Sequence, residues 1–173
     1  LLNEIGNAGR RTQETFEHSI ADLQRTVTSA ISHSANLLAK LAVDILDRNL
    51  YERANDCRWW ALNATLAHCL ASSKRDGKRA TEVLRYINSL YTVYNGLVLF
   101  DSEGRICAVS NPAHNEWVGK QCREDWVGAT LALRDPQTYA VSAFAPSELY
   151  DNRPTLIFGA AIGITNGRAI GGI

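Results

Sequence analysis

The first part of the chain has the hydrophobic spacing of an α-helix from Leu1 to about Tyr51. Apolar residues recur at steps of three and four, which places them on one continuous stripe. Charged and hydroxyl residues fill the opposite face, and no proline interrupts the stretch. We predict one long helix, with two helices separated near Ser32–Asn36 as the alternative. The stripe consists of Phe16, Ile20, Leu23, Val27, Ala30, Leu37 or Leu38, Leu41 and Ile45.

Helical spacing continues through Asp47–Ser72 and returns in Arg79–Leu90. Between these stretches, Lys74–Lys78 predicts a solvated break with a helix-ending glycine. The triplet Arg58-Trp59-Trp60 has two interpretations. It is either a binding wall for anions and flat groups or a helix face that docks its aromatic rings onto a sheet, and we favour docking.

The pattern then becomes strand-like, beginning with a predicted β-hairpin. Tyr91–Phe100 is rich in aromatic and β-branched residues, and Ile106–Ser110 is a second apolar run. Between them, Asp101–Arg105 is a turn cluster in which Gly104 is free to take a positive φ. We expect Asp101 to bond its own backbone in this turn rather than to contact a ligand. Such a hairpin needs a third strand or a helix on its apolar face.

The rest of the chain predicts loops, one short helix and further strands. These are a loop over Asn111–Gln121, a helix within Arg123–Ala132, a strand over Tyr139–Phe144, a loop over Pro146–Pro154, a strand buried on both faces over Thr155–Ile164, an Asn166-Gly167 hairpin turn and the start of a last strand at Ala169–Ile173. The predicted fold is therefore α+β: a long N-terminal helix over residues 1–50, then an antiparallel sheet of about five strands flanked by helices over 51–173.

Composition excludes some classes of function. The 173 residues include 18 basic and 18 acidic side chains, a balance that disfavours nucleic-acid binding. No apolar run approaches the roughly 20 residues of a membrane span, and no signal peptide stands at the start. The chain opens within a helical pattern and stops within a strand-like one, so we expect a piece of a larger protein. The four cysteines form no CxxC pair and predict buried thiols rather than a metal site or disulfides.

The sequence offers no catalytic motif. HExxH, GxSxG and phosphate-binding glycine loops are all missing from it. His68 and Cys69 are adjacent on a predicted helix, so they face different directions and form no nucleophile–base pair by themselves. We therefore predict a protein that is not an enzyme and that uses no cofactor and no metal.

The order of these segments resembles the Cache domain, the PAS-like extracytoplasmic sensor module of bacterial chemoreceptors and related kinases and cyclases. The resemblance extends over residues 37–173. It is carried by the long entry helix and by the segments YNGLVLFDSEGRICAVS, DWVGATLALRDPQTYAVSAFAPS and PTLIFGAAIGITNGRAIGGI. It implies that a ligand lies between the sheet and an overlying loop and helix.

The resemblance also implies which residues bind this ligand. Arg123 and Trp126 would hold a carboxylate and Tyr139 an amine, with Tyr94 and Phe144 completing the site. A small carboxylate and an amino acid are equal candidates for the ligand. Judged from the residues alone, Trp126 and Tyr139 are equally consistent with core positions, and Arg123 with a surface charge.

The function implied is that of a sensor domain in a bacterial signal transducer of the methyl-accepting chemotaxis type. Two copies would pair through the long helix, which would pass the signal to an output domain outside this chain. The sensor region of such a membrane protein lies in the periplasm. The alternative is a cytoplasmic PAS- or GAF-like dimerisation module without a ligand, because four thiols favour a reducing compartment.

Overall fold

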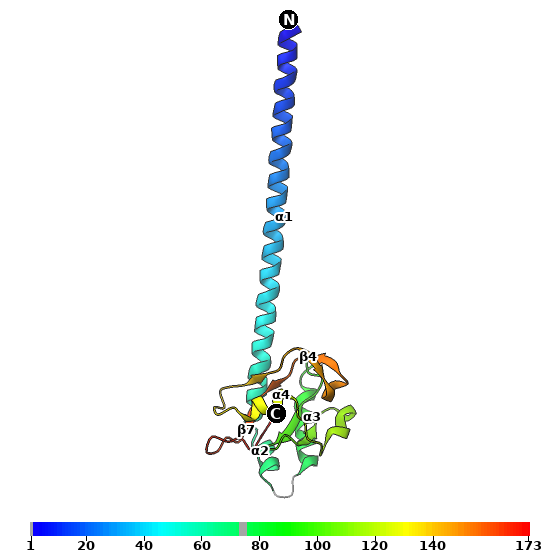
Figure 1. The fold of residues 1–173 in the computed structure, drawn as a ribbon, viewed down its shortest axis with the longest axis vertical. Helices are drawn as coiled ribbons and strands as arrows, with labels where there is room; N and C mark the ends of the chain where they lie inside the picture. The colour runs from blue at the N-terminus through cyan, green and yellow to red at the C-terminus, as the bar shows by residue number, and fades with distance from the viewer. Residues whose placement is uncertain (1, 73–75) are drawn as a thin grey trace. The chain divides into compact units, whose positions relative to one another are not determined.

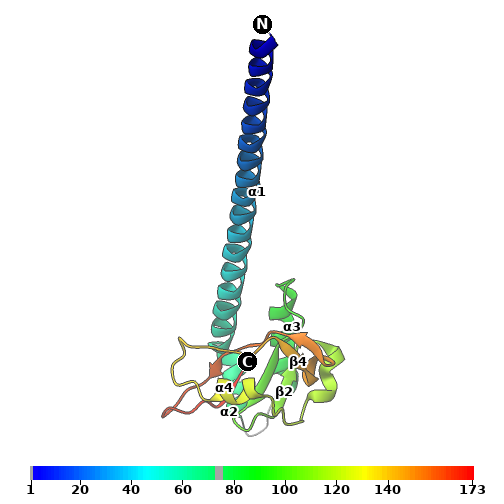
Figure 2. The same cartoon turned by 45° about the horizontal axis from the view of Figure 1, so that its top comes forward.

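The computed structural model describes residues 2–72 and 76–173, and these have the predicted α+β fold. Internal contacts divide the chain into two compact units, residues up to Asn49 and Leu50–Ile173. The first helix, α1 (Leu2–Ala61), includes the first unit and the beginning of the second. Figures 1 and 2 draw it as one uninterrupted coil. The alternative of two helices separated near Ser32–Asn36 is therefore wrong.

The first unit consists of α1 alone, and its apolar stripe is exposed. Among its members, Phe16 is 66% exposed, Leu23 64% and Leu37 62%. Exposed apolar side chains at three- and four-residue steps are typical of a helix that pairs with another helix.

Two shorter helices follow α1, namely α2 (Ala64–Ala71) and α3 (Gly77–Ser89). The predicted continuous helix over Asp47–Ser72 is wrong at Asn63, which lies between α1 and α2 and whose side chain caps α2. Its Oδ1 accepts hydrogen bonds from two backbone N–H groups of the first turn of α2, at 2.9 and 3.3 Å. The short helix predicted over Arg79–Leu90 is confirmed as α3.

The predicted helix-ending glycine begins a helix instead. Gly77 is the first residue of α3, and Asp76 caps this helix by accepting a hydrogen bond from the Arg79 N–H at 3.1 Å. Lys74 and Arg75, the other part of that predicted break, lie outside the described residues.

The main sheet of the second unit has four antiparallel strands in the order β2-β1-β8-β7. Two smaller antiparallel pairs, β3–β6 and β4–β5, extend the strand region. The strands are β1 (Val98–Asp101), β2 (Ile106–Val109), β3 (Ala140–Val141), β4 (Ala145–Ser147), β5 (Arg153–Thr155), β6 (Phe158–Gly159), β7 (Ala161–Ile162) and β8 (Gly171–Gly172). The β4–β5 hairpin is orange in Figures 1 and 2.

The β1–β2 hairpin confirms the predicted turn but shortens the first strand. Asp101 Oδ1 accepts hydrogen bonds from the N–H groups of Glu103 and Arg105, both at 2.9 Å, and Gly104 has φ +76°. Asp101 therefore bonds its own turn, as expected. The strand begins only at Val98 rather than at residue 91.

Residues 91–94 contribute an aromatic cluster in place of a strand. The rings of Tyr91 and Tyr94 meet Trp60 edge-on, with centroids 5.3 and 4.9 Å from the indole. Trp60 is buried, whereas Trp59 is 73% exposed. The docking interpretation of the Arg58-Trp59-Trp60 triplet is confirmed for Trp60 and wrong for Trp59.

Successive residues of β1 point to opposite faces of the sheet and enter two separate cores. Leu99 packs with Leu66 of α2 and Leu84 of α3 on one face. Phe100 packs with Trp126 on the other face. The sheet is therefore covered on both faces, and the second core supports the region predicted to bind a ligand.

The part of the chain after β2 is more finely divided than predicted. The expected loop over Asn111–Gln121 contains the 3₁₀ helix η1 (Pro112–Trp117), and the loop over Pro146–Pro154 contains most of β4 and β5 together with η2 (Glu148–Tyr150). The single strand expected over Thr155–Ile164 is split among β5, β6 and β7. The strand expected over Tyr139–Phe144 retains only β3, and the last strand only Gly171–Gly172.

The predicted short helix is confirmed as α4 (Asp125–Leu131). The Asn166-Gly167 turn is also confirmed, with φ +52° and +70° at its two residues. Among the described helices, none combines the length and the apolar character that crossing a bilayer requires.

Candidate functional site

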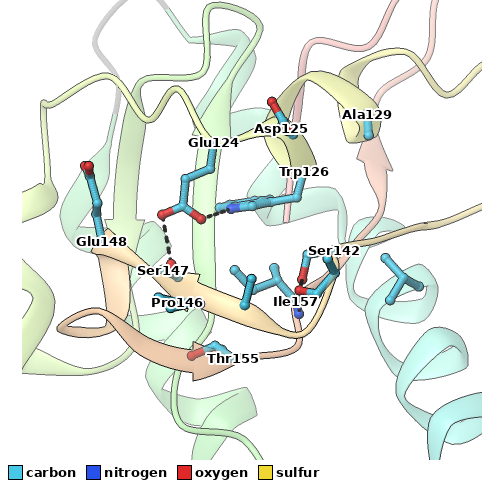
Figure 3. Close-up of a pocket in the computed structure, with 13 residues that line it drawn as sticks. Glu124, Asp125, Trp126, Ala129, Ser142, Pro146, Ser147, Glu148, Thr155 and Ile157 are labelled. Atoms are coloured by element: carbon cyan, nitrogen blue, oxygen red, sulfur yellow. Dashed lines mark hydrogen bonds between the residues drawn. The ribbon is translucent and has the colours of Figure 1, made fainter.

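The candidate site is built around the first turn of α4. Glu124, the residue that precedes this helix, has an extended backbone, and its carboxylate accepts hydrogen bonds from two different segments. Its Oε2 accepts from Trp126 Nε1 at 2.8 Å, and its Oε1 accepts from Ser147 Oγ at 2.8 Å (Figure 3). A longer contact of 3.5 Å joins the Leu149 N–H to the same Oε1. Glu124 therefore connects α4 to strand β4.

Between α4 and the β4–β5 hairpin lies a cleft of about 450 Å³, which we call the acidic cleft. Figure 3 shows Glu124 and Trp126 on one side of it and Pro146 and Thr155 on the other. Its lining consists of Glu124, Asp125, Trp126, Ala129, Val141, Ser142, Ala143, Ala145, Pro146, Ser147, Glu148, Thr155 and Ile157.

The charges of this cleft all have one sign. Glu124, Asp125 and Glu148 line it, whereas its described lining contains neither lysine nor arginine. Asp125 and Glu148 are exposed, and Glu124 is half-buried. A partly buried carboxylate interacts more strongly with an opposite charge than an exposed one, because water screens it less. The cleft therefore favours a cationic group.

A second cavity of about 230 Å³, which we call the apolar cavity, lies behind Trp126. Trp126 and Ile157 line both cavities and thus form the wall between them. The lining of the apolar cavity consists of Leu50, Arg53, Cys57, Trp60, Val93, Tyr94, Gly96, Leu97, Val98, Trp126, Leu156, Ile157, Phe158 and Ile173.

The polar groups of the apolar cavity gather around Tyr94. The Tyr94 hydroxyl donates a hydrogen bond of 2.5 Å to Asp56 Oδ2, and the Arg53 guanidinium lies 5.1 Å from the Tyr94 ring centroid. Burial, and then the bond to Asp56, raise the pKa of Tyr94 above its usual 10.0. Burial raises the pKa of Cys57 from 9.0 to about 12. Both groups therefore stay protonated near neutral pH.

The structure brings together two of the five residues predicted to bind a ligand. Trp126 is buried and lines both cavities, and Tyr94 lines the apolar cavity. Arg123 is exposed and lines neither of them. Tyr139 is 43% exposed, with its ring 6.4 Å from Phe158, and Phe144 is 72% exposed. The predicted grouping of Arg123, Trp126 and Tyr139 around one ligand is not present in this arrangement.

Several residues of the site are not among those predicted from the sequence. Glu124 and Asp125 stand beside Trp126, and an acidic pair before an aromatic residue was the available signal. Ser147 lies 23 residues from Glu124 in the sequence, so no local pattern indicated their contact. Arg53 and Asp56 resemble ordinary polar positions on a helix until the fold places Tyr94 against them.

Within the described residues, the cysteines and the possible metal ligands form no further site. Cys57, Cys69 and Cys122 are buried and Cys107 is half-buried, as predicted. Across residues 2–72 and 76–173, no three His, Cys, Asp or Glu side chains come together as metal ligands. Comparison with known proteins finds no family that matches the chain and no characterised protein with significant similarity to it.

Proposed function

We propose that this chain is the sensor region of a bacterial signal transducer of the chemoreceptor type, and that its acidic cleft binds a small molecule with an ammonium group. The observation that carries the proposal is the lining of the cleft, which includes three acidic residues and, among the described residues, no lysine or arginine. The resemblance to Cache domains supports the same general position for the ligand, between the strands and α4.

The chemistry of the cleft narrows the expected ligand. An ammonium group has three donors and no acceptor. Glu124 Oε1 already accepts from Ser147 and Leu149, whereas Oε2 has a lone pair beyond the one that accepts from Trp126. The Trp126 ring adds an aromatic surface. A simple carboxylate would meet only like charges in this lining, whereas an amino acid or an amine brings the cation. The proposed ligand is therefore an amino acid or a small amine.

The route of the signal follows from the elements that the cleft joins. A ligand held by Glu124 and by the β4–β5 hairpin stabilises one arrangement of these elements over others, and this differential affinity shifts the equilibrium. The exposed stripe of α1 supports a homodimer through this helix, with the output domain outside this chain. The proposal places the sensor in the periplasm, with the cytoplasm as the alternative.

Calorimetric titration of the full chain with amino acids, primary amines and organic acids tests the proposal. We expect a cationic ligand to bind and Glu124→Gln to weaken its affinity at least tenfold, because hydrogen bonds to charged groups contribute about 1.5–3 kcal/mol. The glutamine retains a side-chain oxygen that accepts a hydrogen bond but removes the charge. The control is Glu82→Gln, an exposed substitution on α3 outside the cleft lining.

Two outcomes contradict the proposal. One is equal binding of the cationic ligand by the parent and Glu124→Gln, and the other is binding of organic acids alone. If no compound of the panel binds and the protein is dimeric, the dimerisation module without a ligand replaces the sensor. The observation that favours this second function is the exposed apolar stripe of α1.

A further inference from the structure

The polar side chains that line the apolar cavity are paired within the protein. Arg53 is the single charged side chain among the described residues of its lining. The Arg53 guanidinium lies 3.3 Å from a Glu52 carboxylate oxygen and 3.6 Å from Asp56 Oδ2, so its charge already has partners. The Tyr94 hydroxyl donates to Asp56 at 2.5 Å, and Trp126 Nε1 donates to a carboxylate of the acidic cleft at 2.8 Å. These groups therefore have their hydrogen bonds without a ligand.

The main chain beside the cavity is paired as well. The Leu97 N–H donates to Ser110 Oγ at 2.7 Å, and the Leu97 carbonyl oxygen accepts from the Ser110 N–H at 2.9 Å. Ile157 forms the same two bonds with Ser142, both at 2.9 Å. A buried water needs two to four polar partners. Walls whose polar groups are paired elsewhere therefore favour an apolar occupant over water.

The size and the walls of the cavity indicate what kind of apolar molecule fits. Trp60, Tyr94, Trp126 and Phe158 contribute rings, which offer surfaces on which a flat molecule can lie. An apolar protein cavity of about 150 Å³ stays dry and binds benzene. At about 230 Å³, this cavity has room for a benzene ring with a short alkyl substituent.

The cavity has both a mouth and a buried interior. Leu50 and Val93 line it and are exposed, so the cavity reaches the surface beside them. Leu97, Val98 and Ile173 also line it and are buried. A small molecule can therefore enter without unfolding of the domain and then lose most of its contact with water.

We propose that the apolar cavity is a binding site for a small uncharged aromatic hydrocarbon, held by burial and ring contacts without a hydrogen bond or an ion pair. Removal of the ring and its alkyl group from water provides the free energy of binding. A charged ligand would lose its hydration without gaining a partner, because Arg53 is already paired. The site is separate from the acidic cleft, with which it shares only the wall formed by Trp126 and Ile157.

The test compares ethylbenzene, benzene and benzoate on the full chain. Saturation-transfer NMR detects their binding, and titration gives their dissociation constants. Each buried CH₂ strengthens binding about fourfold, so ethylbenzene should bind about tenfold more tightly than benzene. Benzoate has a similar size and adds a charge, so it should bind at least about tenfold more weakly than ethylbenzene. None of the probes contains an ammonium group, so this proposal and the one for the acidic cleft can fail separately.

Nuclear Overhauser effects locate the bound ethylbenzene in the parent protein without any substitution. We expect contacts between its protons and the methyl groups of Leu97, Val98 and Ile173, which are buried in the lining. Contacts confined to the exposed apolar stripe of α1 would show adsorption to the surface and would overturn the proposal.

Variants that fill the cavity provide the second arm of the test. Cys57→Leu enlarges a buried lining residue, and Val93→Phe narrows the mouth at an exposed position if Cys57→Leu does not fold. Each should weaken ethylbenzene binding at least about tenfold. The matched control is Val118→Phe, the same substitution at an exposed position outside the lining, which should leave the dissociation constant unchanged.

Three further results overturn the inference. They are no detectable binding of ethylbenzene, binding of benzoate as tight as that of ethylbenzene, and unchanged ethylbenzene binding by a folded Cys57→Leu protein. Equal weakening by Val93→Phe and Val118→Phe has the same meaning, because the effect would then not depend on the cavity.

Discussion

Two glycines determine how closely α4 approaches the strands. The Thr130 side chain of α4 is fully buried, and its hydroxyl donates a hydrogen bond of 2.7 Å to the Trp126 carbonyl oxygen. A Cβ atom on Gly159 would lie 2.1 Å from Thr130 Oγ1, and one on Gly172 would lie 2.8 Å from Thr130 Cγ2. Only glycine leaves the space for this contact, which helps to position Trp126 as the wall between the two cavities.

This close contact predicts a specific loss of stability. Gly159→Ala should lower the free energy of unfolding by about 1–3 kcal/mol, because Thr130 has no free space into which to move. Gly128→Ala, in α4 with Thr130, is the matched control. Nothing lies within 4 Å of its added Cβ, so alanine should raise the free energy of unfolding by about 0.5–1 kcal/mol. Urea unfolding measures both values, and a Gly159→Ala protein as stable as the parent would contradict the packing described here.

For single residues, the sequence predicted where the candidate site lies better than it predicted which side chains give the site its charge. Trp126 was predicted and lies on the wall of both cavities, but the charge of the acidic cleft comes from Glu124 and its neighbours. Arg123 is adjacent to Glu124 in the sequence and yet lies outside the lining. At the start of a helix, neighbouring residues such as Arg123 and Glu124 point in different directions, and the exact residue at which the helix begins decides which of them faces the cleft. The sequence does not determine this, because the contact that orients Glu124 comes from the distant Ser147.

Among the elements, those with local signals were predicted well. The α1 stripe, the Asp101–Arg105 turn and the Asn166-Gly167 turn each depend on residues close together in the sequence. The strands after α4 do not. They are two or three residues long, and their partners are set by tertiary contacts, as when Ala140 pairs with Gly159. Such short segments have no period from which their ends can be predicted.

The exposed stripe on α1 predicts dimerisation through this element. Leu23→Glu places a charge in the middle of the stripe, where pairing with a second helix would bury it at considerable cost. We expect the parent to be a dimer. Leu23→Glu should raise the dissociation constant of this dimer at least tenfold, as measured by analytical ultracentrifugation.

The control for this prediction is Ser32→Glu, which adds the same charge to α1 away from the stripe. It should leave the dimer intact. A monomeric parent, or equal weakening by both substitutions, would contradict pairing through this face. Circular dichroism should show helix in each variant, so that loss of the dimer is distinguished from loss of the fold.

Over the whole molecule, the fold favours the protonated forms of several cysteine thiols and tyrosine phenols. Burial raises the pKa of Cys57 from 9.0 to about 12 and that of Tyr150 from 10.0 to about 12. Burial also raises the pKa values of Cys69, Cys122 and Tyr94. These groups lie in or beside both cores and in the wall of the apolar cavity. The native state therefore releases these protons at higher pH than the unfolded chain does.

This difference gives the stability of the molecule a definite dependence on pH. Below about pH 9 both states retain the Cys57 proton, and its contribution to stability is fully present. As the pH rises towards 12, the unfolded chain loses the proton first, so the free energy of unfolding falls by up to about 1.4 kcal/mol per pH unit for this group. Urea unfolding between pH 9 and about 11 should show this fall. Cys57→Ser, which does not titrate there, should make it shallower, whereas Tyr86→Phe, at a 67% exposed position, should not. A parent protein whose stability is constant over this range would show that these thiols and phenols are open to water.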